Sequence, residues 1–374
     1  MVPMDAVSTS GRMLYDRAVR CGDIPNGLPA FRDGDVLFAK ITPCMENGKG
    51  AHVLGLRNGI GFGSTEFHVL RANARGDARF LFYWTQWPSF RSVAQANMTG
   101  SAGQRRVPAD FLAAFRLPLP PLPEQQKIAA VLSSVDTAIE KTEALIAKLR
   151  DLKTAMMQEL LTKGIGHTRF KDSPVGSIPA EWEVVRLGSV LKLVEGRSVE
   201  MQDDSDYRLV TVKRRYGGVV NRAVAKGREI LVKTQFRLHA GDFLVSKRQI
   251  VHGACEVVPA DLDGATVSNE YEILRPTQAL HMGFLRWLSQ TRLCQDQFSR
   301  NSVGVHIEKM LLKTDDWLRE SIPLPGLPEQ VSIAASIDSV HTRRGMHEAR
   351  LASLHFLKKA LMQDLLTGRV RVKV

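Results

Sequence analysis

Basic and amide-bearing side chains gather in a few short loops of this sequence, where they could bind phosphates and base edges. The loop TGSAGQRR, residues 99–106, combines glycines with Gln104, Arg105 and Arg106. Glycine lets a backbone approach a phosphate closely, and arginine or glutamine can pair with base edges in the major groove. The alternative is an ordinary solvated loop whose arginines bind nothing. The candidate DNA-binding residues of the whole chain are Lys40, Asn47, Lys49, Ser101, Gln104, Arg105, Arg106, Lys213, Arg214, Arg215, Lys247, Arg248, His306 and Lys309.

Residue patterns of known catalytic and metal centres are missing from the sequence. The loop TPCMENGKG, residues 42–50, resembles a phosphate cradle but lacks the GxxxxGK[ST] spacing. We find no HExxH motif, no Pro-Pro-aromatic methyltransferase motif and no plausible Ser/His/Asp trio. The cysteines at 21, 44, 255 and 294 are too far apart for a short-spaced zinc site and are expected to be buried thiols. We therefore expect no catalytic residue, metal or cofactor in this chain.

The charge balance favours a polyanionic partner. Lys and Arg number 51 against 39 Asp and Glu, a formal net charge of +12. Such a surplus favours nucleic acid, because neutralised phosphates release condensed counterions, although it would also serve simple solubility. With 44% hydrophobic residues, no long uninterrupted apolar stretch and no signal-peptide pattern, the chain is expected to be globular, to have no membrane span and to be cytoplasmic.

An internal repeat organises the chain. Residues 117–136 match residues 322–341 at 12 of 20 positions, and residues 149–162 match residues 354–367 at nine of 14, both at an offset of 205. Chance would give about one match in fifteen or twenty positions. The chain is therefore a duplication of one unit.

Each repeated segment has the signals of one long helix. Pro123 and Pro328 suit the start of a helix, and glycines 164 and 368 suit its end. A helix that runs from Pro123 to just before residue 164 would span about 60 Å at ~1.5 Å per residue. Apolar residues spaced by threes and fours indicate a seam that needs a partner helix, with Lys153 and Lys358 occupying the same slot in the two copies. The candidate helix-pairing residues are Ile128, Leu132, Val135, Ile139, Ile146, Leu149, Ile333, Ile337, Val340, Leu351, Leu354 and Leu361.

A globular head precedes each helix, so we expect the two helices to pair antiparallel with one head at each end, in a pseudo-twofold α+β arrangement. The Gly-Asp turn and apolar run of residues 34–40 match residues 241–247. We predict strands at 67–70, 183–186 and 271–274, and helices around 80–95 and 283–298. The expected divisions are a first head over 1–121, a helix over 122–163, a linker and second head over 164–326, and a second helix with its tail over 327–374. The first head has no counterpart to residues 181–206, about two dozen residues, so we expect an incomplete, N-terminally truncated domain.

The chain resembles the specificity subunits of type I restriction–modification enzymes. The resemblance rests on the two LPLPPLPEQ-to-LLT and IPLPGLPEQ-to-LLT segments, the joining run GIGHTRFK at 164–171 and the IPAEW segment at 178–182. It implies that each head is a target recognition domain for one half of a bipartite double-stranded DNA site. The helices would fix the gap between the halves and dock modification methyltransferase subunits, two in number. It also implies that S-adenosylmethionine, ATP and Mg²⁺ act in the modification and restriction subunits and not in this chain.

Two other functions are compatible with the same residues. An autonomous sequence-specific DNA-binding protein would bind its site without any methyltransferase. A scaffold in which the coiled coil alone matters would leave the basic loops without a role. Within the resemblance itself, a truncated and inactive specificity subunit is a further possibility.

Overall fold

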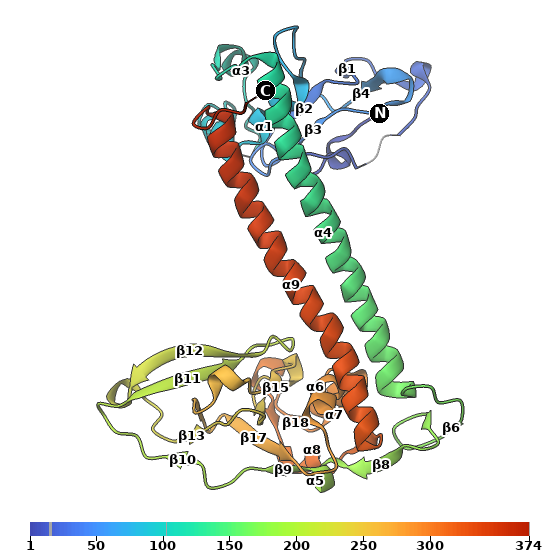
Figure 1. The fold of residues 1–374 in the computed structure, drawn as a ribbon, viewed down its shortest axis with the longest axis vertical. Coiled ribbons are helices and arrows are strands. Elements are labelled where there is room, and N and C mark those ends of the chain that lie inside the picture. Colours follow the sequence, from blue (N-terminus) through green and yellow to red (C-terminus); the bar gives the residue numbers. More distant parts are fainter. Residues whose placement is uncertain (15–16, 102, 374) are drawn as a thin grey trace. The chain divides into compact units, whose positions relative to one another are not determined.

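The computed structural model describes residues 1–14, 17–101 and 103–373 and divides the chain into two compact units. Unit 1 comprises Met1–Leu145 with His347–Val374, and unit 2 comprises Ile146–Met346. Two long helices, α4 (Leu122–Lys163, 42 residues) and α9 (Leu327–Leu366, 40 residues), each contribute to both units (Figure 1). Among the residues that the structure describes, no helix is long and apolar enough to span a membrane.

Unit 1 contains the first head and a pair of helix segments. In the head, an antiparallel sheet of order β3-β2-β5 lies with a second antiparallel pair, β1-β4. The strands are β1 (Ala30–Arg32), β2 (Val36–Ala39), β3 (Gly50–His52), β4 (Ile60–Phe62) and β5 (Phe67–Leu70). The helices are α1 (Ala78–Gln86), α2 (Pro88–Ala96) and α3 (Ala109–Ala114).

Unit 2 contains the second head, whose sheet β15-β14-β17-β9 repeats the β3-β2-β5 arrangement and adds one strand. A second sheet has the order β10-β13-β16-β11-β12, and β20-β8, β18-β19 and β6-β7 form separate pairs. The helices are α5 (Leu187–Val190), α6 (Met282–Leu288), α7 (Arg292–Arg300) and α8 (Thr314–Leu318). The strands are β6 (Phe170–Lys171), β7 (Ile178–Pro179), β8 (Glu183–Arg186), β9 (Leu191–Leu193), β10 (Ser198–Val199), β11 (Asp206–Val212), β12 (Val219–Lys226), β13 (Gln235–Arg237), β14 (Phe243–Ser246), β15 (Cys255–Val257), β16 (Thr266–Ser268), β17 (Tyr271–Pro276), β18 (Ser302–Val303), β19 (Leu311–Leu312) and β20 (Ser321–Leu324).

The Gly-Asp turn that both heads share has the same construction in each. The Asp35 carboxylate is buried before β2 and accepts hydrogen bonds from the Arg32 N–H and from two nitrogens of Arg71. Before β14, the buried carboxylate of Asp242 accepts hydrogen bonds from the backbone and from two arginines, Arg197 and Arg275. A buried carboxylate requires such partners, which explains why both copies carry aspartate at this turn.

Both long helices form as the sequence predicted. Pro123 and Pro328 lie in the first turns, and the glycines at 164 and 368 take positive φ angles of 68° and 73° just beyond the ends. Those φ values suit glycine because other residues pay a steric cost there.

Within unit 1, the start of α4 runs antiparallel to the end of α9. Ile128, Ala129 and Leu132 of α4 share a core cluster with Met362, Leu365 and Leu366 of α9 and with aromatic residues of α1. Glu124 pairs with Arg371 just after α9, and further along α4 Asp136 pairs with Lys358. The pairs step forward in α4 and backward in α9, which defines the antiparallel direction.

Within unit 2, the end of α4 and the start of α9 pack in the same way around the second head. Leu161 of α4 joins Ile333, Ala334 and Ile337 of α9 in a core cluster that includes Trp182 and Trp287. The predicted α+β class, the internal repeat and the antiparallel helix pairing within each unit are confirmed.

The predicted seam residues are most deeply buried near the ends of the helices. Along the seam, Val135, Ile139, Leu149 and Val340 are also buried. Ile146, Leu351, Leu354 and Leu361 are only partly buried.

Two predicted helices are each interrupted in the structure. The helix expected around 80–95 is broken between Trp87 and Pro88, because proline restricts the preceding residue to extended backbone, here φ −69° and ψ 127° at Trp87. The helix expected around 283–298 is broken at residues 289–291, where the Ser289 and Thr291 hydroxyls donate hydrogen bonds to nearby carbonyls. The strands at 67–70 and 183–186 have the predicted bounds, and the strand predicted at 271–274 continues to Pro276.

Candidate nucleic-acid interface

In the first head, two of the predicted DNA-binding loops lie side by side. Lys40 follows β2, and its carbonyl accepts a 2.9 Å hydrogen bond from the N–H of Val107, at the end of the 99–106 loop. The Thr42 N–H donates to the Arg105 carbonyl at 2.9 Å, which joins the 40–49 loop to the same segment. The structure therefore brings the loops of Lys40 and Arg105 together, although 65 residues separate them in the sequence.

The second head repeats this hydrogen-bond pattern. Lys247 follows β14, and its carbonyl accepts a 3.0 Å hydrogen bond from the N–H of Leu312 in β19. The Lys247 N–H donates to the Glu270 carbonyl, as the Lys40 N–H donates to the carbonyl of Glu66. The two heads thus place a lysine, a glutamate and a loop from the helical part of the head in the same relationship.

A third predicted segment, residues 213–215, joins this surface in the second head. The Arg215 and Tyr216 N–H groups donate to the carbonyls of His252 and Gly253 at 2.7 and 2.8 Å. Arg215 and Tyr216 have φ angles of 58° and 55°, a region that residues with side chains seldom occupy. These hydrogen bonds hold the unusual turn in place, and the Arg215 side chain extends into solvent.

Several of the predicted cations already have partners within the chain. The Arg106 guanidinium binds the Glu66 carboxylate at 2.8 to 3.2 Å, and this contact lowers the pKa of Glu66. Arg105 donates to the Gln95 carbonyl at the end of α2 at 2.9 Å, and Lys49 Nζ donates to the carbonyl of Met4 at 2.9 Å. In the first head, the exposed members of the predicted set are therefore the uncharged side chains of Asn47, Ser101 and Gln104.

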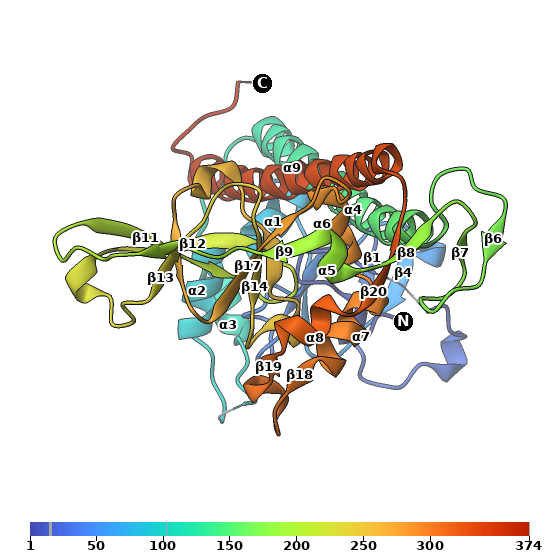
Figure 2. The same ribbon diagram turned by 90° about the horizontal axis from the view of Figure 1, so that it is seen from below.

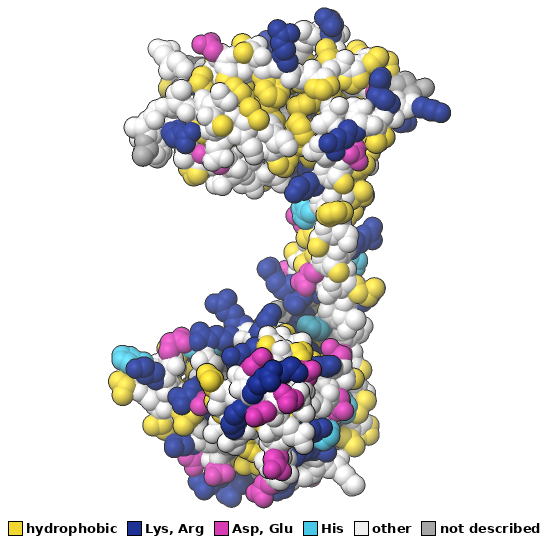
Figure 3. All heavy atoms as spheres, turned by 90° about the vertical axis from the view of Figure 1, so that its left-hand side faces the viewer, with side chains coloured by type: hydrophobic (Ala, Val, Ile, Leu, Met, Phe, Trp, Pro, Cys, Tyr) yellow, Lys and Arg dark blue, Asp and Glu magenta, His cyan; other side chains and the backbone are white. Residues whose placement is uncertain are grey.

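In the second head, the predicted basic side chains fall into a paired and an unpaired group. The paired ones are Arg214 with Glu308 at 2.5 Å, Arg248 with Glu270 at 2.5 Å and Lys247 with Glu272 at 3.3 Å. Lys213, Arg215, His306 and Lys309 are exposed and make no ion pair within the described part of the chain. Figure 3 shows Lys and Arg side chains mixed with Asp and Glu on this unit. A side chain of the paired group must leave its glutamate before it can bind a phosphate. A side chain of the unpaired group can bind a phosphate directly.

One functional candidate was missed from the sequence. Arg91 in α2 is 7% exposed, and its guanidinium donates to the carbonyls of Met45, Gly48 and Lys49 in the 40–49 loop. It also lies over the Phe38 ring, 5.2 Å from the centroid, and burial lowers its pKa to about 10. In the sequence, Arg91 lies between the apolar residues Phe90 and Val93. That position was the signal from which a buried, loop-fixing arginine could have been predicted.

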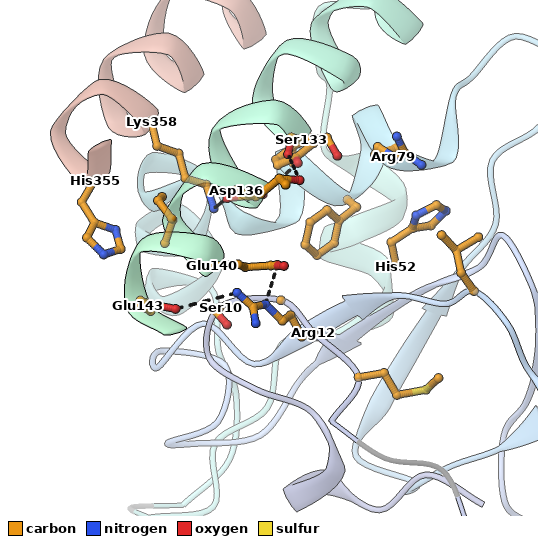
Figure 4. Close-up of a pocket in the computed structure, with 17 residues that line it drawn as sticks. Ser10, Arg12, His52, Arg79, Ser133, Asp136, Glu140, Glu143, His355 and Lys358 are labelled. Carbon is orange, nitrogen blue, oxygen red and sulfur yellow. Dashed lines mark hydrogen bonds and ion pairs between the residues drawn. The ribbon is translucent and has the colours of Figure 1, made fainter. Parts of the chain in front are cut away.

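The first unit also contains a cavity of about 400 Å³ beside α4, lined by both charged and apolar residues, which Figure 4 shows in close-up. Four of its charged residues form two ion pairs: Arg12 lies 2.7 Å from Glu140, and Lys358 lies 2.6 Å from Asp136. No cluster of metal-ligand residues occurs among the residues that the structure describes.

Residues 31–150 match the family model of the type I restriction modification DNA specificity domain. The chain is also 27% identical over 320 residues to the type I restriction enzyme MjaVIII specificity subunit of Methanocaldococcus jannaschii, covering 83% of this chain and 74% of that protein. The chain is thus similar to type I specificity subunits over most of its length. The resemblance that the repeated helices suggested is confirmed.

Other type I specificity subunits match over shorter segments. The EcoEI specificity subunit of Escherichia coli is 34% identical over 171 residues, which is 41% of this chain and 29% of that protein. That alignment therefore spans less than a third of the Escherichia coli protein.

Solved structures of the family support the fold. The S subunit of a type I restriction–modification system from M. genitalium aligns over 98% of this chain with a TM-score of 0.55 and 13% identity. A chain from a type I R–M system, solved in work on complex assembly and conformational transition, aligns over 99% with a TM-score of 0.53 and 21% identity. At these sequence identities, the two matches show a similar fold and nothing further.

Proposed function

We propose that the chain is the DNA-specificity subunit of a type I restriction–modification complex, in which each head reads one part of a two-part DNA target. The observation that carries the proposal is the repeated hydrogen-bond pattern around Lys40 and Lys247. Two matched scaffolds support loops of different sequence, which is the arrangement expected for one architecture that reads two different half-sites. Similarity to type I specificity subunits supports the same function.

The chemistry of the two loop surfaces suits duplex DNA. Exposed cations such as Arg215 and Lys309 can bind phosphates and fix the position of a head, with the release of counterions. Exposed amides such as Gln104 can form paired hydrogen bonds with base edges in the major groove. Phosphate contacts would thus set the register, and a few side chains would read the sequence.

We further propose that the catalytic steps belong to partner subunits. Modification methyltransferase subunits, two per specificity subunit, would bind S-adenosylmethionine and methylate the DNA. Restriction subunits would use ATP and Mg²⁺ for translocation and cleavage. Such a complex would act on DNA in the cytoplasm, and this chain would supply sequence recognition and docking surfaces without a catalytic residue of its own.

The long helices would connect recognition to spacing. Each head is followed directly in the chain by one helix of about 40 residues, and the helices pack antiparallel within each unit. We propose that the paired helices fix the number of base pairs between the two parts of the target.

The proposal is tested with the chain purified together with its modification subunit. Footprinting should show a split sequence with a fixed gap, and mapping of methylated adenines in host DNA, with and without the gene, should give the same sequence. Tight specific binding by the lone chain, with no methylation linked to the gene, would instead favour an autonomous DNA-binding protein. The absence of any sequence preference in the complex would overturn the proposal.

A further inference from the structure

The hairpin β18–β19 of the second head exposes three apolar side chains within five residues. Val303 is 63% exposed, Val305 is 94% exposed and Ile307 is 56% exposed. Single exposed apolar residues are common on protein surfaces, but a cluster at the tip of a projecting hairpin indicates a contact surface. In Figure 2 this hairpin projects beyond α7 and α8.

The tip is held in a defined conformation without a partner. Ser302 pairs with Leu312 and Val303 with Leu311 at its base, and the Ser302 hydroxyl donates to the Phe298 carbonyl at 2.7 Å. A Cβ atom at residue 304 would lie 2.8 Å from the Lys309 carbonyl oxygen, so glycine is needed for the close turn. A pre-ordered tip loses little conformational freedom on binding.

The surroundings of the tip indicate a nucleic-acid partner. Leu312 is hydrogen-bonded to Lys247, and Glu308 contacts both Arg214 and His252, so the hairpin is continuous with the candidate interface. His306 and Lys309, within or next to the tip, are exposed. The Lys309 ammonium can pair with a phosphate while the apolar tip meets base edges, a combination that suits a DNA groove.

The first head argues against a protein partner shared by both heads. Its loop at the same place in the scaffold, residues 99–106, reads TGSAGQRR and has no large apolar side chain. Two heads that docked equivalent subunits through this loop would be expected to present similar residues. Loops that read different half-sites would differ, as these do.

We propose that the tip of this hairpin enters the major groove of one half-site and that Val305 packs against the C5-methyl group of a thymine. The thymine methyl is the apolar group that a base pair offers in the major groove. The inference rests on the proposed function, because it names the chemistry that one head reads. Val305 would be a specificity-determining residue without any hydrogen bond of its own.

The experiment measures binding of the complex with its modification subunit to its mapped target. Each thymine is replaced in turn by deoxyuridine, which removes only the methyl group. For the wild-type chain, one replacement should weaken binding about fivefold, in line with the loss of one buried methyl. In Val305→Ser the same replacement should have no effect, and binding to the normal target should already be weakened about fivefold. The dependence on salt should stay unchanged, because no charge is altered.

Val224→Ser is the matched control. Val224 is 62% exposed on β12 of the same head and lies outside the 302–312 hairpin. This variant should keep the wild-type affinity and the wild-type response to deoxyuridine.

Three results would overturn the inference while leaving the proposed function intact. Independent, additive effects of Val305→Ser and the base change would exclude contact between the two methyl-bearing groups. If no thymine of the target gave weaker binding on replacement by deoxyuridine, the proposed contact with a thymine methyl would also be excluded. Loss of the modification subunit from Val305→Ser would show that the tip docks protein. Failure of the wild-type complex to prefer any sequence would reject the proposed function itself, and this inference with it.

Discussion

The ammonium group of Lys358 in α9 lies 2.6 Å from Oδ1 of Asp136 in α4. The hydroxyl of Tyr83 in α1 donates a 2.8 Å hydrogen bond to the other oxygen of the same carboxylate. Figure 4 shows the Lys358 side chain directed at Asp136 beside the cavity of the first unit. One carboxylate therefore ties both long helices to the first head.

Replacement of Lys358 by Met should destabilise the first unit. About one-fifth of each side chain of the pair is exposed, 19% for Lys358 and 22% for Asp136, so loss of the cation leaves a largely buried carboxylate without its counter-charge. We expect a loss of about 2 kcal/mol in the free energy of unfolding, measured by denaturant titration. Lys127→Met, at an exposed position on α4, is the control and should change stability by less than about 0.5 kcal/mol.

A buried glutamine should be equally important in each head. Gln330 accepts a hydrogen bond from the His281 N–H and donates to the carbonyls of Ala279 and Pro325. Gln125 makes the corresponding three hydrogen bonds with Asp77, Arg75 and Pro120.

Gln330→Leu keeps the size of the side chain but leaves one buried N–H and two carbonyls unpaired, so it should cost about 3 kcal/mol in the free energy of unfolding. Gln125→Leu should behave alike, and wild-type stability in either variant would contradict this account. The nearby exposed Gln126→Leu, measured by the same denaturant titration, is the control.

The second unit should become more stable as the solution is made alkaline. Burial, with the charges of Arg344 and Arg286, lowers the pKa of Lys153 to about 8, from a usual 10.5. Between these two values the unfolded state binds more protons than the folded state, so the free energy of unfolding rises with pH through that window.

The difference from Lys153→Met isolates this contribution. That variant should show a flatter dependence of stability on pH between about 8 and 10.5, since it has no group to titrate there. Lys148→Met, at an exposed position of α4, should keep the wild-type slope. Equal slopes in all three proteins would mean that folding does not lower the pKa of Lys153.

Salt dependence should separate free from paired cations in the second head. Lys309→Ala and Arg215→Ala should each reduce the slope of log affinity against log salt by about 1, and should weaken binding to all sequences alike. Arg214 is bound to Glu308, so Arg214→Ala should change the slope by less. Footprint titrations from low to physiological salt give the measurement, and an unchanged slope in Lys309→Ala would remove that residue from the phosphate contacts.

The helices should determine the gap between the two parts of the target. Deletion of seven residues from both helices would shorten them by about 10 Å at ~1.5 Å per residue. We expect a smaller preferred gap with both half-sites unchanged, read from methylated adenines in host DNA. Retention of the original gap would contradict a role of the helices in spacing.

The sequence by itself determined the repeat, both long helices and the resemblance to type I specificity subunits. These rest on local or periodic signals: Pro123 and Pro328 at the helix starts, glycines at the ends, and twelve identical positions in the repeated segment. The breaks at residues 87–88 and 289–291 were missed because apolar residues flank each break, although Pro88 and the polar run at 289–291 stand in the sequence.

Only the tertiary structure decided which cations are free. Arg106 and Arg215 look alike in the sequence, yet Arg106 is bound to Glu66, forty residues away, and Arg215 extends into solvent on a left-handed turn. Composition and spacing identify a basic loop, but ion pairing depends on which strands become neighbours. Sheet pairing brings distant carboxylates beside these loops, and no local pattern encodes that contact.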